Sequence, residues 1–329
     1  MLTGYDGHES SAAYEPMTRT ILPRSAAVVV VWRDASNALE AVASLRAMPL
    51  CPETIICVVQ EATVPESWRA LEPGIRVVEL SDNYGFAHSI DLGVSLALEA
   101  GAEWILLLND DAVVEPSCLA RCVQEAQSDS SVAAVGPAVV FGDRPDTIWF
   151  AGGRHSDDFL YTRHHALGRT VDKLPVTSDT DYIAGCCMLV RADAWRALGG
   201  FREDFFLYYE DVEWCLRARN AGWRCRYVAE VLCRHRAGSS TQDGQRAISA
   251  TSAYYRARNP LRFARETKSL RRRVTRTAGV LLIRTPYFVF QLIRAHDRQA
   301  GRAYLQGLRD GLGGRMGRGP WPREMPSPT

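Results

Sequence analysis

The sequence contains almost no lysine: Lys173 and Lys268 are the only two, and arginine makes up the rest of the 39 basic residues. No apolar run reaches the roughly 18 residues that a membrane-spanning helix needs, and the first 24 residues show no charged-then-apolar signal segment. The formal net charge is only +1, so the overall charge gives no reason to expect a nucleic-acid partner. These absences predict a cytoplasmic protein.

A disulfide framework is also missing. The nine cysteines are an odd number, and their spacing fits neither a set of disulfides nor a zinc site. We predict buried free thiols in a reducing compartment, because most of these residues belong to apolar surroundings. Seven of them lie in or beside apolar runs: Cys51, Cys57, Cys186, Cys187, Cys215, Cys225 and Cys233.

Short β-branched runs alternate with amphipathic segments through residues 26–240. This alternation predicts an α/β fold with a mostly parallel sheet and helices on both faces. In such sheets, ligands bind at the carboxyl ends of the strands. The predicted strands cover residues 26–32, 54–59, 75–80, 104–108, 182–190 and 224–228, and the predicted helices cover residues 88–100, 192–198 and 210–220.

The flanking segments differ in composition. We predict a flexible tail over residues 1–25, a helical extension over residues 241–312, and a disordered Gly/Pro-rich tail over residues 313–329. From Arg262 to Arg318 there are 14 Lys or Arg against three acids.

Within this basic region, Val280–Ile293 is apolar but is interrupted by Arg284 and Pro286. An apolar stretch flanked by arginines is typical of a helix that lies peripherally on the inner face of a membrane. The alternative is a helix that packs on the α/β domain or on a second copy in a homodimer.

Two acidic clusters are candidate sites. Asn109-Asp110-Asp111 directly follows a predicted buried strand, where oxygen ligands suit a divalent cation that bridges a diphosphate; a strand-ending Asx-turn is the alternative. Glu210-Asp211 follows an aromatic run at a helix start. There Asp211 is either an N-cap or a general base whose aromatic neighbours exclude water.

Among the histidines, His235 follows the last predicted strand, where it either completes a metal site as a neutral imidazole or is structural. His155, His164 and His165 fit no metal-ligand spacing, so we expect them on solvated loops.

The segment Ser81–His88 joins a predicted strand to a helix. Its glycine, Gly85, permits a tight bend, and the helix start offers free amides that suit a phosphate. The segment is neither a G-x-G-x-x-G motif nor a P-loop.

Taken together, these segments resemble family 2 glycosyltransferases of the GT-A fold, and within that family the bacterial rhamnosyltransferase-like branch. The resemblance covers about residues 26–240 and extends more loosely to about residue 314. It is carried by Asn83-Tyr-Gly-Phe-Ala87 with Asp91-Leu-Gly93, Leu108-Asn-Asp-Asp111, Gly185-Cys-Cys-Met-Leu-Val-Arg191, Gly200-Phe-Arg-Glu-Asp-Phe-Phe-Leu-Tyr-Tyr-Glu-Asp211, His235 with Gly238-Ser-Ser240, and Tyr254-Tyr-Arg-Ala-Arg-Asn259.

The resemblance implies an active site. It assigns a divalent metal, Mn²⁺ or Mg²⁺, to Asp111 and His235, and it makes Asp211 the general base with Glu210 beside it in the catalytic pair. The implied donor is a dTDP-sugar, such as dTDP-rhamnose, or a UDP-sugar. The residues expected to bind this nucleotide sugar are Trp32, Gln60, Asn83, Gly85, Phe86, Asn109 and Asp110.

The implied reaction is the inverting transfer of a single sugar to a hydroxyl of a glycan, glycolipid or small-molecule acceptor. Polysaccharide, glycolipid and natural-product glycoside biosynthesis are all compatible with it. A single transfer is expected because the Gln-x-x-Arg-Trp motif of the family's processive synthases is absent.

Two departures from the family pattern concern the donor site. The family's first strand ends in an aromatic residue followed by Asn, whereas here it ends in Trp32-Arg33. Its second strand ends in Asp-Asn-x-Ser, whose Asp helps to hold the base, whereas here Gln60 and Glu61 follow Val59. The alternative is therefore a degenerate domain of this fold that binds without catalysis. A nucleotidyltransferase is disfavoured, because no Gly-rich pyrophosphorylase loop follows the first strand.

Overall fold

The computed structural model of the chain describes residues 24–33, 35–64, 68, 74–156, 161–236, 248–265 and 269–321. Its strands are β1 (Ser25–Trp32), β2 (Thr54–Gln60), β3 (Ile75–Leu80), β4 (Trp104–Asn109), β5 (Ala112–Val114), β6 (Val132–Phe141), β7 (Arg144–Phe150), β8 (Gly153–Ser156), β9 (Tyr161–His164), β10 (Ser178–Asp179), β11 (Cys187–Arg191) and β12 (Arg224–His235). Its helices are α1 (Ala35–Arg46), α3 (Phe86–Glu99), α4 (Cys118–Gln127), α5 (Ala192–Leu198), α6 (Glu210–Asn220), α7 (Ala250–Arg265), α8 (Leu270–Gly279), α9 (Thr285–Ala295) and α10 (Arg298–Gly313), together with the 3-10 turns η1 (Val171–Lys173) and η2 (Glu203–Phe205) and the π-helical turn η4 (Val280–Arg284).

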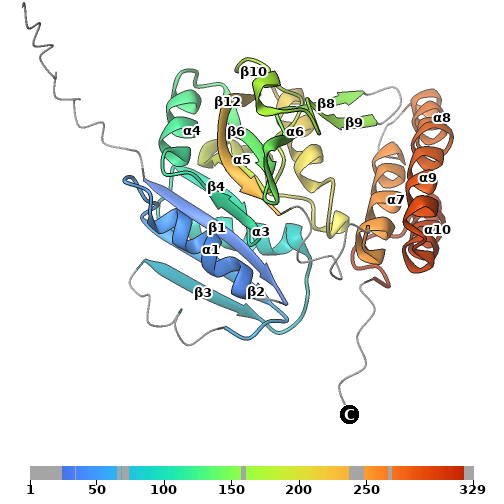
Figure 1. Cartoon of the computed structure of the whole chain (residues 1–329), viewed down its shortest axis with the longest axis horizontal. Coiled ribbons are helices and arrows are strands. Elements are labelled where there is room, and N and C mark those ends of the chain that lie inside the picture. Colours follow the sequence, from blue (N-terminus) through green and yellow to red (C-terminus); the bar gives the residue numbers. More distant parts are fainter. Residues whose placement is uncertain are drawn as a thin grey trace, which may run out of the picture.

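One ten-stranded sheet organises the first part of the chain, in the order β10-β12-β6-β11-β4-β1-β2-β3, with β5 added at β12 and β7 at β6 (Figure 1). Strands β1, β2, β3 and β4 run parallel, whereas β11 is antiparallel to β4 and β6. Consecutive side chains of β1 point to opposite faces of the sheet, and nearly all of them are buried. Both faces of the sheet are therefore covered at β1. The predicted mostly parallel α/β sheet is confirmed.

Helix α3 shows how closely the helices approach this sheet. It begins at Phe86, two residues earlier than predicted, and the chain leaves it through Gly101, whose φ of 83° is the left-handed value expected after a helix. A Cβ at Gly93 would lie 2.4 Å from a methyl of Val28 in β1. Glycine at this position therefore permits the contact between α3 and β1.

Two predicted strands have different bounds in the structure. The strand predicted over residues 182–190 begins only at Cys187, because the backbone before it leaves the ladder and the amide of Gly185 donates to a side chain. The last strand was predicted to end at Val228, but β12 continues to His235. Register shifts after Val228 break the alternation of buried and exposed residues, which explains why the pattern seemed to end there.

The cysteines are all free, and all of them are buried except Cys51, which is exposed. The prediction of buried thiols is therefore wrong for Cys51, which lies in the turn before β2. Burial raises the pKa of the Cys57 thiol to about 12. A thiol of that kind packs as a small apolar side chain and is a poor nucleophile.

The C-terminal helices α7, α8, α9 and α10 stand together at one end of the molecule (Figure 1). Of these, α7, α9 and α10 share an apolar core with Phe206 and Trp321. Residues 315–321, which the sequence places in the tail, fold back onto this end: the amide of Gly319 donates to Tyr255 Oη at 2.9 Å, and Trp321 is buried. Within the described residues, no helix has the length and apolarity required to cross a bilayer.

Candidate active site

The chain turns back after β4, and this turn brings Asp111 next to His235, the two candidate metal ligands. Strand β5 pairs with the end of β12 in a register that aligns Ala112 with His235. Consequently His235 Nε2 lies 2.9 Å from Asp111 Oδ1, and both side chains are almost completely buried. The preceding carboxylate points elsewhere, because Asp110 Oδ2 accepts a hydrogen bond of 3.3 Å from the amide of Trp32. The two adjacent acids therefore face different partners.

A carboxylate and an imidazole in this arrangement fit a hard divalent cation. Adjacent ligands of an octahedral cation with bonds of about 2.1 Å lie about 3 Å apart, close to the 2.9 Å between Asp111 and His235. Within the described segments, no third His, Cys, Asp or Glu joins them. Two protein ligands leave positions for diphosphate oxygens and water, which is how magnesium is commonly held.

Aromatic packing fixes the His235 ring. Trp149 meets it edge to face at a centroid distance of 4.6 Å, and His164 packs on Trp149 at 4.7 Å. Burial lowers the pKa of His164 to about 4, so this ring is neutral near neutral pH. The expectation of solvated loops is wrong for His164 and His155, which lie in the paired strands β9 and β8. Spacing along the chain gave no signal for this packing.

The second acidic cluster begins helix α6. The N-cap is Tyr209, not Asp211, so the capping alternative for Asp211 is wrong. Asp211 Oδ2 accepts from the amide of Gly185 at 2.9 Å, and Oδ1 accepts from the amide of Val212 at 2.7 Å. Burial raises the pKa of Asp211 despite these two hydrogen bonds, which act in the opposite direction.

Its neighbour Glu210 is more deeply buried than Asp211. Burial, and then the negative charge of Asp211, raise the pKa of Glu210 well above its ordinary range. One of its carboxyl oxygens has no hydrogen-bond partner among the described residues. This larger shift favours the protonated form of Glu210, so Asp211 is the first of the pair to ionise.

One short backbone segment brings the two clusters together. The amide of Gly185 donates to Asp211, and the carbonyl of the next residue, Cys186, accepts a 3.1 Å hydrogen bond from the amide of Asn109. The Asn109 side chain in turn lies 3.4 Å from His235 Nε2. The clusters are about 100 positions apart in the sequence, yet two consecutive residues connect them.

The loop that leads into α6 is held in an unusual conformation. Phe206, Tyr208 and Tyr209 have φ values of 67°, 66° and 80°, and such values are costly for aromatic residues. Asn259 in α7 compensates for this cost: its Nδ2 donates to the carbonyls of Phe205, Leu207 and Tyr208 at 3.1, 2.8 and 2.7 Å.

Arg258, also in α7, adds a 2.7 Å hydrogen bond to the carbonyl of Phe205. Both Arg258 and Asn259 are completely buried. The sequence resemblance marked this pair without assigning it a role. We infer that it is a positioning element for Asp211, because it fixes the loop that ends at the catalytic pair.

A substitution at Asn259 tests this positioning role. Asn259→Asp keeps the shape but turns a donor into a charged acceptor facing three carbonyl oxygens, so we expect destabilisation of at least ~3 kcal/mol. Denaturant unfolding measures it, with Asn220→Asp at the exposed end of α6 as the matched control. Equal stability of the two variants would contradict the role. In the folded fraction, kcat should fall more than donor affinity.

The donor-side residues gather at the ends of β1, β2 and β3. Asn83 Oδ1 accepts from the amide of Gly85 at 2.9 Å, and the amide of Phe86 donates to the carbonyl of Phe206 at 2.8 Å. Gly85 has a φ of 95°, and a Cβ there would lie 2.7 Å from the Phe206 ring. The segment Ser81–Phe86, which we call the donor segment, therefore directly contacts Phe206 in the loop before Glu210 and Asp211.

Gln60 is almost fully buried, and its Oε1 accepts from the amide of Tyr84 at 2.9 Å. This bond braces the donor segment, so the more exposed Glu61 is the better candidate for contact with a nucleotide. Trp32 Nε1 donates to Glu61 Oε2 at 2.8 Å, and Arg318 from the C-terminal segment lies 3.8 Å from Glu61.

Arg318 also pairs with Asp82 at 2.8 Å and lines a hollow of about 480 Å³ in this region. No sequence pattern pointed to Arg318, because its partners lie some 240 positions earlier in the chain. The side chains around the hollow belong to Asp82, Asn83, Tyr84, His88, Glu203, Asp204, Phe206 and Arg318, with Gly317.

Comparison with known proteins gives a consistent result. The sequence profile of the family described as "Glycosyltransferase like family 2" matches residues 23–258. Two solved structures are similar in fold, each with a TM-score of 0.52: a mannosyltransferase from Pyrobaculum calidifontis in complex with GDP-Man and Mn²⁺ (14% identity, 89% of this chain and 88% of that one), and GalNAc-T7 with UDP, GalNAc and Mn²⁺ (13% identity, 64% and 43%). The predicted GT-A fold is thereby confirmed.

Similar sequences among characterised proteins include several rhamnosyltransferases. The N-acetylglucosaminyl-diphospho-decaprenol L-rhamnosyltransferase of Mycobacterium tuberculosis is 27% identical over 194 residues, which cover 52% of this chain and 62% of that protein. The rhamnosyltransferase WbbL of Escherichia coli is 30% identical over 155 residues (44% and 58%), and the dTDP-rhamnosyl transferase RfbF of Shigella flexneri is 24% identical over 189 residues (56% and 61%). The chain thus spans about three fifths of the length of these relatives.

Proposed function

The chain belongs to glycosyltransferase family 2, and on that premise we propose that it transfers one sugar from a nucleotide-diphosphate sugar to an acceptor hydroxyl, with inversion at the anomeric carbon. The observation that carries the proposal is the pairing of the two clusters through Gly185 and Cys186. This connection links Asp211, a carboxylate with a raised pKa, to the carboxylate–imidazole pair of Asp111 and His235. A base and a cation site at one place are what this reaction needs.

Asp211 acts as the general base in this proposal. It takes the proton of the acceptor hydroxyl as that oxygen bonds to the anomeric carbon, while the bond from this carbon to the diphosphate oxygen breaks. The sugar passes through an oxocarbenium-like transition state, so attack from the face opposite the diphosphate inverts the configuration. The raised pKa of Asp211 makes it a stronger base than an ordinary aspartate, and protonated Glu210 does not compete for the proton.

Asp111 and His235 are the residues that would hold Mn²⁺ or Mg²⁺. A cation bound there supplies positive charge to the departing nucleoside diphosphate. His235 would bind it through Nε2, the atom that faces Asp111, and Trp149 keeps the ring in place. Asp110 is fixed on the amide of Trp32, so we assign it to the shape of the donor pocket and not to the metal.

For the donor, we propose dTDP-rhamnose or a UDP-sugar, a choice supported by the rhamnosyl relatives. Stacking on Trp32 and a hydrogen bond to Glu61 replace the base contact that the family's strand-end Asp provides. Glu61 is already held by Trp32 Nε1 and lies near Arg318. The acceptor class is a glycan, a glycolipid or a small molecule, and we propose that transfer takes place in the cytoplasm.

Binding and turnover test this function separately. Calorimetry with dTDP-, UDP- and GDP-sugars, with and without Mn²⁺, identifies the donor, and release of nucleoside diphosphate reports catalysis. We expect metal-dependent binding of one nucleotide class and slow hydrolysis even without acceptor. Tight binding of a nucleotide sugar with no release under any acceptor condition would instead favour the degenerate, non-catalytic alternative.

A further inference from the structure

The outer face of α9 and of the turn η4 is apolar and exposed. Its side chains are each between 52% and 75% exposed: Leu282, Ile283, Tyr287, Phe290 and Ile293. The inner side of the same helix is apolar as well, since Val280, Phe288 and Leu292 are buried against α7 and α10. A surface helix of a globular protein normally turns polar residues outward, so an exposed set of large apolar side chains indicates a binding surface.

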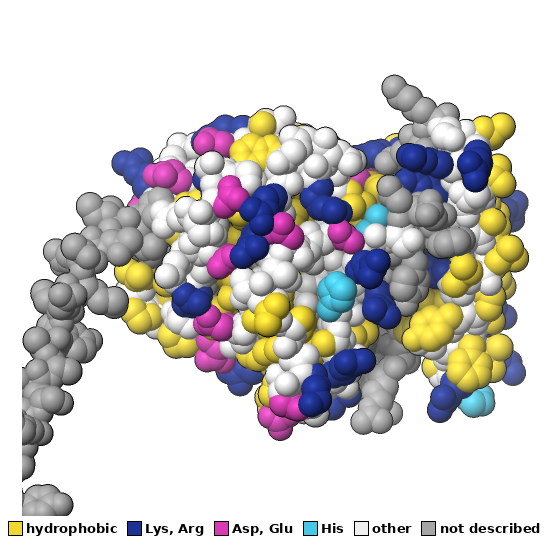
Figure 2. Space-filling model, turned by 90° about the horizontal axis from the view of Figure 1, so that it is seen from above, with side chains coloured by type: hydrophobic (Ala, Val, Ile, Leu, Met, Phe, Trp, Pro, Cys, Tyr) yellow, Lys and Arg dark blue, Asp and Glu magenta, His cyan; other side chains and the backbone are white. Residues whose placement is uncertain are grey.

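The charges around this outer face have one sign. Residues 269–296 contain six arginines and no Asp or Glu, and Arg271, Arg272, Arg273 and Arg294 are exposed. Figure 2 shows hydrophobic and dark-blue basic side chains interspersed at the end of the molecule where Figure 1 places these helices. Large apolar side chains among arginines are the composition of a helix that lies in the headgroup region of an anionic membrane.

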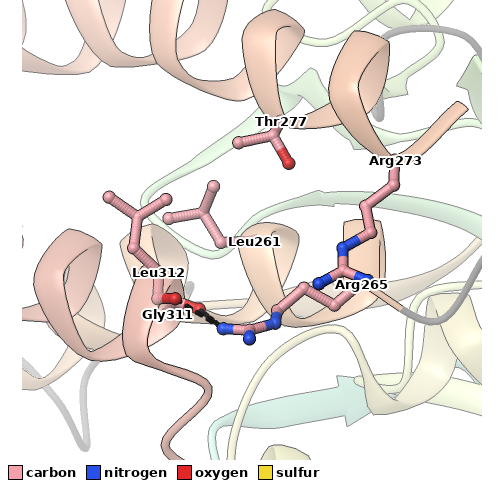
Figure 3. A pocket seen from close by; sticks show the side chains of 6 residues that line it. All are labelled: Leu261, Arg265, Arg273, Thr277, Gly311 and Leu312. Carbon is pink, nitrogen blue, oxygen red and sulfur yellow. Dashed lines mark hydrogen bonds between the residues drawn. The ribbon is translucent and has the colours of Figure 1, made fainter. Parts of the chain in front are cut away.

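A small hollow between α7, α8 and α10 adds a place for a phosphate. It has a volume of about 170 Å³ and is lined by Arg273 of α8 and Arg265 of α7, with Leu261, Thr277, Gly311 and Leu312. In Figure 3, Arg273 reaches from α8 toward Arg265, which hydrogen-bonds the end of α10. Two guanidinium groups at one hollow favour an anionic group such as a lipid headgroup phosphate.

We propose that the outer face of α9 and η4, with the arginines of α8, docks the protein on an anionic phospholipid surface. A second copy of the chain fits less well, because isologous pairing would bring the same arginines together. Leu282 and Phe290 enter the acyl boundary while the arginines contact headgroup phosphates. The helix lies along the surface, since no described helix is able to span the bilayer.

The docked helix also contacts the catalytic loop. The guanidinium of Arg284 lies 5.4 Å from the ring centroid of Tyr209, the residue directly before the catalytic pair. Membrane contact on one side of the helix therefore places Tyr209, and with it the neighbouring catalytic pair, near the lipid surface. If the proposed transfer is correct, this geometry selects a lipid-linked acceptor among the three acceptor classes.

Vesicle sedimentation without any nucleotide sugar tests the docking. We expect the protein to sediment with phosphatidylglycerol-containing vesicles at low salt, to bind phosphatidylcholine vesicles more weakly, and to lose part of its binding as salt rises. Leu282→Ser with Phe290→Ser should lower the partition coefficient about tenfold or more, and Arg271→Gln with Arg272→Gln about 30-fold. Leu167→Ser with Val176→Ser, at exposed apolar positions of the α/β domain, is the matched control.

Two results would overturn the docking. One is an absence of vesicle binding at low salt; the other is an equal loss of binding in the control pair. If the Leu282/Phe290 variant changes a dimer into a monomer in sedimentation velocity while vesicles are not bound, the face is a contact between copies. Donor binding by calorimetry should be unchanged in all three variants. A protein that docks but transfers no sugar would refute the proposed function and leave the docking intact.

Discussion

Asp211→Asn is expected to abolish sugar transfer, lowering kcat by about three orders of magnitude or more, while donor affinity changes little. The amide has nearly the shape of the carboxylate and retains an acceptor oxygen, but it is unable to take the acceptor proton. Asp211 is linked to Asp111 and His235 through the backbone of Gly185 and Cys186, so these two residues should keep their geometry. Steady-state assays give kcat, and calorimetry gives the donor Kd.

Glu210→Gln is the matched control for Asp211→Asn. Burial and the charge of Asp211 raise the pKa of Glu210 well above its ordinary range, which favours the protonated form. Glutamine resembles that form in shape and charge. This variant should therefore retain most of its activity near neutral pH. A loss as large as that of Asp211→Asn would mean that Glu210 takes part in proton transfer. Full activity of Asp211→Asn would refute the assignment of the base.

The pH dependence follows from the raised pKa of Asp211. The base is active only when ionised, so kcat/KM should fall as pH decreases through a value above the ordinary 3.8 of aspartate. The free energy of unfolding changes in the opposite direction with pH. Glu210 has a raised pKa in the folded protein, so its protonated form stabilises the fold, and this contribution is lost as pH rises. Glu210→Gln should therefore lose less stability than the wild type as pH rises above the ordinary 4.5 of glutamate, which denaturant unfolding at a series of pH values measures.

Local patterns in the sequence were sufficient for the fold and for the residue types of the site. Runs such as residues 26–32 identify buried parallel strands, and the aromatic run before Glu210 and Asp211 identifies an unusual helix start. The family resemblance, in turn, assigned the metal to Asp111 and the nucleotide sugar to Asp110. In the structure, Asp111 contacts His235, and Asp110 accepts a hydrogen bond from the amide of Trp32.

The partners that join the site were outside the reach of sequence patterns. Asn259 meets the loop before α6 some 50 positions away, and Arg318 meets Asp82 over 236 positions. Such contacts depend on how the C-terminal helices pack, and a single sequence has no periodicity that reports this packing. For the same reason, the packing of Trp149 on His235 was missed.

Removing the carboxylate of Asp111 should cause the second large loss. Asp111→Ala leaves His235 as a single protein ligand, so metal-dependent affinity for the nucleotide sugar should fall about 100-fold or more. Affinity without metal should change little, because the nucleotide contacts of Trp32 and Glu61 remain. Calorimetric titrations with donor, in the presence of Mn²⁺ and of chelator, give the two affinities.

The neighbouring acid provides the control for this experiment. Asp110→Asn keeps an acceptor oxygen for the amide of Trp32, so it should retain metal-dependent binding. His235→Ala should behave like Asp111→Ala, since Nε2 and Oδ1 lie 2.9 Å apart and share one cation in the proposal. The double variant should then be no weaker in metal-dependent binding than either single one, because one lost ligand already abolishes the site. Additive losses at Asp111 and His235, or a loss at Asp110 as large as at Asp111, would contradict the proposed metal pair.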